Sequence, residues 1–246
     1  MDKENKIEYR LIGRDALFTD PLTKMGGEKF TYQIPTYQAL KGVTESIYWK
    51  PTFVWVVDKV RIMKPIRTQS KGIRPIHYQN NKNDLSIYTY LHDVEYQVQA
   101  HFEWNMNRPD LVNDRNENKH YFIAKRMLER GGRRDIFLGT RECQGYVEPC
   151  PFGEKKGYYD EMDMSFGMML HGITYPEESE QKDGEGEMSV RFWVPVMNKG
   201  VITFIRPEDC KAVRKIRKGK AKTFEPGSNF SGLDEFEQEG WFDGMD

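Results

Sequence analysis

The sequence of 246 residues has few cysteines and no long apolar run. Its three cysteines, Cys143, Cys150 and Cys210, are odd in number and form no C-x-x-C pair. This pattern indicates reduced thiols in a cytoplasmic protein and argues against a disulfide framework or a zinc site. No stretch approaches the roughly 18 apolar residues of a membrane span, and the opening residues, MDKENK, contain no signal-peptide core. We therefore expect a cytoplasmic protein that does not bind membranes.

Net charge is also lacking, because 37 Lys and Arg face 38 Asp and Glu, which leaves −1 at pH 7. The overall charge therefore predicts no class of partner, and only the placement of charges is informative. No G-x-x-x-x-G-K-[ST] motif occurs, and the five histidines show no metal-ligand spacing, so we expect neither a nucleotide nor a metal cofactor. An aromatic share of 13% is too high for a disordered chain.

The first half of the chain alternates between strand and helix patterns. Tyr37, Leu40, Val43 and Ile47 lie on one face of a helix, which Pro51 ends. A second helix begins near Asn116 or Asn118 and ends at the glycine pair 131–132, with Phe122, Ile123, Met127 and Leu128 as its apolar face. Strands are predicted over 9–18, 53–63, 85–91, 94–104 and 136–138, with a loop over 68–84 and a hairpin turn at 92–93.

This order, β-α-β-β-α-β, predicts an α+β fold with a ferredoxin-like domain over residues 1–150. A turn at 198–200 between two apolar runs indicates a small antiparallel β domain over 151–207, which includes an acidic segment over 160–187. Residues 208–246 are expected to form a flexible tail, basic and then acidic. The seven Lys and Arg of its basic run, 211–222, suit either a solvated segment or a contact with RNA.

The predicted topology brings two helix ends together. Strands of such a domain alternate in direction, so both helices cover one face of the sheet and run antiparallel. The first helix then ends, with Tyr48 and Lys50, near the start of the second, with Lys119 and His120. Helix axes about 8–10 Å apart allow these side chains to meet.

These residue types suit phosphate chemistry. A helix N-terminus attracts phosphate, Lys119 can neutralise charge on a pentacovalent phosphorane, and His120 can donate a proton. Tyr48 can take or orient the proton of an attacking hydroxyl. With the 2′-OH of RNA as nucleophile, no metal is needed, and the products are a 2′,3′-cyclic phosphate and a 5′-OH. The residues alone also allow a structural role, with Tyr48 as a capping aromatic and Lys119 and His120 in a solvated first turn.

Basic residues gather around the second helix and in the loop after the second strand. Between residues 108 and 141, nine Lys and Arg face five Asp and Glu. This distribution suits a surface that follows an RNA backbone, and it equally suits a solvated charged face. The candidate RNA-binding residues are Lys50, Arg67, Arg74, Arg126, Arg130, Arg133, Arg134 and Arg141.

Several longer motifs carry a family resemblance over roughly residues 7–207. They are the segments 19–24 (TDPLTK), 35–42 (PTYQALKG), 45–51 (ESIYWKP), 115–120 (RNENKH) and 131–149. Together they resemble the CRISPR-associated protein family five of the subtype I-C (Dvulg) kind, which belongs to the RAMP superfamily. The residues after about 208 share no such resemblance.

The resemblance implies a ferredoxin-like, RRM-like fold and a metal-independent endoribonuclease. Members of this kind cut precursor crRNA in the repeat stem-loop and remain bound as a subunit of the type I-C Cascade complex, beside its backbone and large subunits. By motif, the catalytic tyrosine, lysine and histidine fall on Tyr48, Lys119 and His120. The alternative is a subunit that binds the 5′ handle of the crRNA without cutting it. A metal-dependent DNA nuclease is disfavoured, because helix capping explains Asp114 and Glu117 better than a metal site does.

Overall fold

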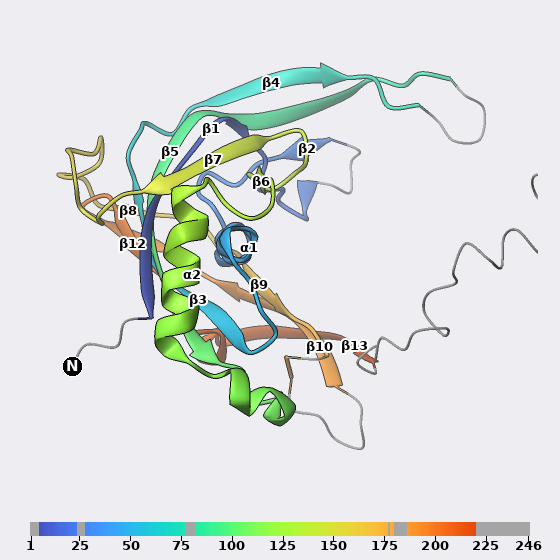
Figure 1. Cartoon of the computed structure of the whole chain (residues 1–246). Helices are drawn as coiled ribbons and strands as arrows, with labels where there is room; N and C mark the ends of the chain where they lie inside the picture. The colour runs from blue at the N-terminus through green and yellow to red at the C-terminus, as the bar shows by residue number, and fades with distance from the viewer. Residues whose placement is uncertain (1–4, 24–27, 77–81, 177, 180–185, 220–246) are drawn as a thin grey trace, which may run out of the picture.

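The computed structural model describes residues 5–23, 28–76, 82–176, 178–179 and 186–219 (Figure 1). Within these ranges the strands form two sheets, of ten and three strands. The larger sheet contains β1 (Lys6–Ala16), β2 (Lys29–Phe30), β3 (Phe53–Ile62), β4 (Thr68–Ile73), β5 (Ser86–Trp104), β6 (Ile136–Phe137), β7 (Gln144–Pro149), β8 (Met164–Ser165), β11 (Val196–Asn198) and β12 (Val201–Thr203). The smaller sheet contains β9 (Met169–Thr174), β10 (Gly186–Trp193) and β13 (Ala212–Gly219). The helices are α1 (Tyr37–Ile47), α2 (Glu117–Glu129) and two 3₁₀ turns, η2 (Pro109–Asp114) and η3 (Pro207–Asp209).

The centre of the larger sheet has the predicted ferredoxin-like order. Its strands run β7-β1-β5-β3, and each neighbouring pair is antiparallel. Helix α1 connects β1 to β3, and α2 connects β5 to β7. The α+β, ferredoxin-like fold class predicted from the order of elements is therefore confirmed.

Three local predictions in this domain were wrong. Residues 92–93 form no hairpin turn, because β5 continues through them while β1 pairs with it on both sides. Part of the predicted loop, 68–73, is strand β4, whose backbone pairs with β5 although its exposed side chains show no alternation. The fourth strand of the ferredoxin order is β7, and residues 136–137 form only the short edge strand β6 beside it.

The strands after residue 150 are shared between the two sheets. The β11–β12 hairpin turns at Lys199 and Gly200, which both have positive φ, as expected for a two-residue turn. Because β12 pairs with β3, this hairpin and β8 extend the larger sheet. A separate domain over 151–207 stays a prediction. The flexible tail predicted from residue 208 is wrong for 212–219, which form β13, whereas 220–246 lie outside the described residues.

Helix α1 follows the predicted pattern. Thr36 caps its N-terminus by accepting a hydrogen bond from the Ala39 N–H, and Tyr37, Leu40, Val43 and Ile47 are all buried. These side chains join a core formed with the sheet, in which Trp55, Tyr9 and Leu11 are fully buried. None of the described helices is long and apolar enough to span a membrane.

Helix α2 has the predicted limits and most of the predicted apolar face. Asn116 caps it, as expected, and Gly131 and Gly132 end it with φ of 82° and 108°. Of the predicted apolar face, Leu128 is buried and Ile123 and Met127 pack against the core, whereas Phe122 is exposed. The polar His120 also points inward and is completely buried, which the pattern did not predict.

The two helices do not lie antiparallel side by side. Figure 1 shows α2 from the side and α1 nearly end-on. The carbonyls of Ser46 and Ile47, at the end of α1, accept hydrogen bonds from the N–H groups of Arg133 and Arg134, which follow the end of α2. The chain then runs on in an extended conformation from Tyr48 toward η2, where Thr52 contacts Asp114. This segment leads into β3 and contacts the region directly before α2.

Candidate active site

Tyr48 and His120 meet beneath the surface, as the sequence predicted. The Tyr48 hydroxyl lies 2.9 Å from Nδ1 of His120. Tyr48 is the residue that ends α1, and His120 lies in the first turn of α2. His120 is completely buried and Tyr48 is 2% exposed, so a solvated first turn is excluded for His120.

Hydrogen bonds determine which nitrogen of His120 carries the proton. Nε2 lies 2.8 Å from the backbone carbonyl oxygen of Asp114, which can only accept. Nε2 therefore donates, and in the neutral ring Nδ1 is left to accept the Tyr48 O–H. Tyr48 and His120 thus form a directed hydrogen-bond chain that ends at the backbone of η2.

Aromatic rings surround this pair. The ring centroids of Phe53, Trp104 and Phe102 lie 5.2, 5.9 and 6.4 Å from that of His120. The indole N–H of Trp55 donates to the Tyr48 carbonyl at 2.6 Å, which fixes the backbone beyond α1. Burial raises the pKa of Tyr48, and the nearby Asp114 charge raises it further, so the phenol is neutral at physiological pH.

Lys119 lies at the surface beside the pair, with half of its side chain exposed. Its ammonium group contacts one oxygen of Asp114 at 2.5 Å, and Thr52 donates to the other at 2.6 Å. These two hydrogen bonds lower the pKa of Asp114 to about 2. The same carboxylate lies 3.4 Å from Nε2 of His120. Asp114 therefore connects Lys119, Thr52 and His120.

The role of Asp114 was missed from the sequence. Helix capping was the predicted role, but the N-cap is Asn116, which accepts from the Lys119 N–H. Asp114 lies five residues before Lys119, beyond the reach of helical i,i+4 spacing, and η2 together with Thr52 positions its carboxylate. The feature of the sequence that could have indicated this role is the segment Pro109–Asp114, a turn that begins with proline and ends with aspartate directly before the helix.

The eight candidate RNA-binding residues are all exposed, but they do not form one group. Arg126 lies on α2, Arg130 is its C-cap, and Arg133 and Arg134 follow its C-terminal end. Arg67 and Arg74 lie directly before and after β4, which pairs with the first part of β5 at the top of Figure 1. Lys50 follows Tyr48, and Arg141 lies in the turn before β7.

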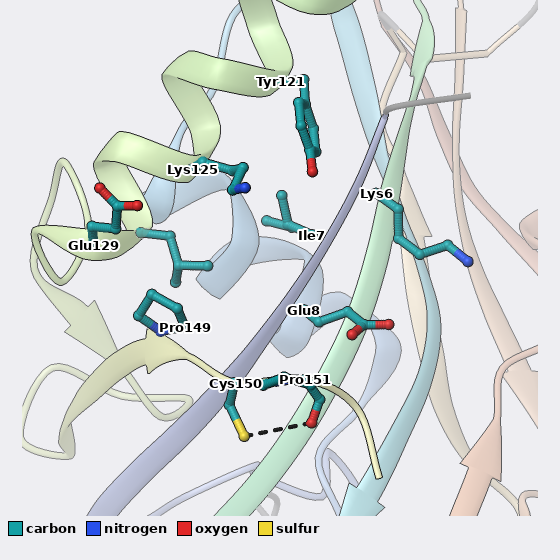
Figure 2. Close-up of a pocket in the computed structure, with 10 residues that line it drawn as sticks. Lys6, Ile7, Glu8, Tyr121, Lys125, Glu129, Pro149, Cys150 and Pro151 are labelled. Atoms are coloured by element: carbon teal, nitrogen blue, oxygen red, sulfur yellow. Dashed lines mark hydrogen bonds between the residues drawn. The ribbon is translucent and has the colours of Figure 1, made fainter. Parts of the chain in front are cut away.

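A cavity of about 540 Å³ lies between α2 and β1 (Figure 2). Across it, Tyr121 and Lys125 of α2 face Ile7 and Glu8 of β1. Tyr121 and Lys125 directly follow the buried residues His120 and Ala124 along the helix. The thiol of Cys150 also lines it, and burial raises the pKa of that thiol. The cavity contains neither Tyr48 nor His120, so the candidate site lies elsewhere on α2.

The described residues contain no group of three or more His, Cys, Asp or Glu side chains that could hold a metal ion. Asp114, with its lysine, threonine and histidine neighbours, is satisfied by hydrogen bonds from the protein.

Residues 7–205 match the model of a CRISPR-associated protein family, Cas5, in its Cas5d form. The chain belongs to this family. The matched range includes Tyr48, Lys119 and His120 and ends before η3 and β13.

Relatives of the Cas5d kind resemble the chain over most of their length. A protein of Mannheimia succiniciproducens named CRISPR pre-crRNA endoribonuclease Cas5d is 28% identical over 200 residues, which cover 70% of this chain and 86% of that protein. One of the same name from Thermus thermophilus is 26% identical over 74% of this chain and 82% of its own length. A solved structure from Streptococcus mutans is 37% identical with a TM-score of 0.70, and it covers 85% of this chain and 96% of the other.

Proposed function

We propose that this Cas5d chain is a metal-independent endoribonuclease that cleaves precursor crRNA in the CRISPR repeat stem-loop. Cleavage proceeds by attack of the RNA 2′-OH, with a 2′,3′-cyclic phosphate and a 5′-OH as products. Two curated relatives carry the name of this activity. The observation that carries the proposal is the hydrogen bond between Tyr48 and His120 beside Lys119, at the start of a helix.

Proton transfer starts from the neutral Tyr48 phenol. Its raised pKa keeps it from ionising alone, but its proton already points at His120 Nδ1. As the phenol gives that proton to Nδ1, its oxygen can take the proton of the 2′-OH. The oxygen of the 2′-OH then attacks the phosphorus. The bond to the 5′-oxygen breaks, and the imidazolium returns the proton to this leaving group through the phenol.

Lys119 supplies positive charge to the reacting phosphate. In the free protein its ammonium group is held by Asp114, and the phosphate must compete for it. Because Tyr48 and His120 are covered, productive binding also requires the RNA to open the surface around them. Transfer of Lys119 from Asp114 to the phosphate places a positive charge where the phosphorane forms.

We further propose that the chain stays on its product as a subunit of the type I-C Cascade complex, beside the backbone and large subunits. The protein acts in the cytoplasm, where its RNA is transcribed. Exposed arginines on α2 and around β4 offer contacts to RNA phosphates away from the site.

The test is incubation of the full chain with an end-labelled repeat RNA in excess EDTA. One cut is expected, and a single 2′-deoxy substitution at the scissile nucleotide should abolish it. Tyr48→Phe should stop cleavage while RNA binding is retained. If the chain binds the repeat RNA but Tyr48→Phe and His120→Gln leave its maturation unchanged, the chain only holds the 5′ handle, which the complete burial of His120 would then explain.

A further inference from the structure

Strand β13 is an unusually basic element that lies beyond the matched family range. Between residues 211 and 219 there are five Lys or Arg and no Asp or Glu. β13 is the edge strand of the smaller sheet, pairs only with β10 among the described strands, and exposes nearly all of its side chains. In a chain of net charge −1, this is a local concentration of positive charge.

The register divides these basic residues between two faces. Arg214 pairs with Val190 and Arg217 with Met188, so both arginines share one face of the sheet. An irregularity beside Met188 places an extra residue between them on β13, and Lys215 and Lys218 therefore occupy the opposite face. The arginines are spaced like residues two apart on β10, which is about 7 Å.

The arginine face has the properties of a single-stranded nucleic-acid platform. Met188, Val190 and Phe192 are half-buried on it, next to the two exposed guanidinium groups. Neither Arg214 nor Arg217 makes an ion pair within the described part of the chain, whereas Lys215 on the other face pairs with Glu187 at 2.8 Å. Unpaired arginines beside partly exposed apolar side chains can contact phosphates and stack on bases.

A residue of this sheet and a neighbour of the candidate active site line the same cavity. Arg191, which follows Val190 on β10, lines a cavity of about 480 Å³. Trp104 lines the same cavity, and its ring centroid lies 5.9 Å from that of His120. The smaller sheet therefore borders the cavity wall that packs against His120.

We propose that the Arg214–Arg217 face of the smaller sheet is a second RNA-binding surface, which holds a single-stranded segment of the RNA through its phosphates. The proposal rests on the proposed function for the identity of the ligand, but not on the catalytic roles of Tyr48 and His120. The contact is independent of base sequence, because guanidinium groups recognise phosphate and the aromatic ring of Phe192 can stack on any base.

The experiment compares two matched double variants in the full chain that carries Tyr48→Phe, so that RNA is bound without being cut. Arg214→Gln with Arg217→Gln removes the proposed contacts, and Lys215→Gln with Lys218→Gln removes equal charge from the opposite face of the same strand. The probe is a fluorescein-labelled single-stranded RNA of mixed sequence, and its Kd is measured over a series of salt concentrations. Unchanged thermal midpoints check that both variants fold.

The arginine variant should weaken binding several-fold at low salt. Its slope of log K against log salt should be shallower by about 1.4, since each phosphate contact to a single strand contributes about 0.7. The lysine variant should change the slope by less than half as much. Equal effects of the two variants, or no effect of the arginine variant, would overturn the proposal and favour an acidic protein partner for β13. Cleavage by the chain with native Tyr48 is scored separately, so loss of this inference leaves the proposed function intact.

Discussion

Two histidines of this protein are completely buried, but their surroundings differ. His120, in the larger sheet's core, has a hydrogen-bond partner at each ring nitrogen, Tyr48 and the Asp114 carbonyl. His171, in β9, has only the Ile205 carbonyl at Nε2, while its Nδ1 has no partner in the described structure. Proton transfer needs both a donor and an acceptor, so only His120 is arranged for it.

The aromatic neighbours reinforce this contrast. Around His171, Tyr37 stacks at 4.4 Å and Trp193 packs edge-on at 5.5 Å. Burial lowers the pKa of His171 to about 4, and the positive charge of Arg191 contributes to this. The comparison teaches that burial among aromatic rings does not by itself mark a catalytic histidine. The second hydrogen bond and the neighbouring lysine are what distinguish His120, for which we propose a catalytic role.

The largest expected effect separates the two histidines by activity. His120→Gln should lower the cleavage rate by roughly 10²–10⁴-fold, because it removes a proton-transfer group. His171→Gln should leave the rate within a few-fold of the unaltered chain. Single-turnover cleavage of a labelled repeat RNA measures both. A large loss for His171→Gln in a folded protein would contradict the comparison.

The next largest expected effect is on the stability of the fold, which should depend on pH through His171. The pKa of His171 is about 4 when folded and about 6.5 when unfolded, so the unfolded chain binds this proton first as pH falls. Its contribution to stability is complete above about pH 6.5. Between there and pH 4 we expect a loss of about 3 kcal/mol in the free energy of unfolding.

Urea unfolding across this pH range measures that loss. His171→Gln should remove this part of the pH dependence, because glutamine does not titrate. His120→Gln serves as the control and should retain it. If both variants keep the same acid sensitivity, the proton is taken up elsewhere.

The smallest effect concerns Asp114, the acidic partner of Lys119. Asp114→Asn keeps the backbone carbonyl that holds His120 but releases the lysine. Since a surface ion pair contributes about 0.2–1 kcal/mol, RNA binding should tighten by up to about fivefold. Measured affinity for the uncut repeat RNA in a Tyr48→Phe background tests this. Weaker binding would show that Asp114 orients Lys119 for RNA instead of competing for it.

Local patterns predicted much of this structure. The spacing of Leu40, Val43 and Ile47 defined α1, and Asn116 with the glycine pair at 131–132 defined the limits of α2. The element order then led to the ferredoxin-like sheet. Prediction failed where the side-chain pattern did not indicate the backbone conformation. Examples are the exposed strand β4 and the long strand β5, which continues without a turn.

The candidate site was predicted by a partly incorrect route. Tyr48 and His120 do meet, but the helices do not run antiparallel, and an extended segment after α1 brings the tyrosine to its partner. The carboxylate of Asp114 could not be placed from spacing, since a 3₁₀ turn and Thr52 from a distant segment position it.

The amino-acid sequence by itself determined the helices, their caps, the order of the elements and the residue types at the site. These features depend on neighbours a few positions apart, which spacing and propensity describe. Only the tertiary structure decided that His120 points inward, that Asp114 holds Lys119, and that two arginines of β13 share one face. The first and the third depend on hydrogen bonds between segments far apart in the chain, and the second depends on the 3₁₀ turn that brings Asp114 back to Lys119. The register of a strand, unlike its existence, is set by its partner.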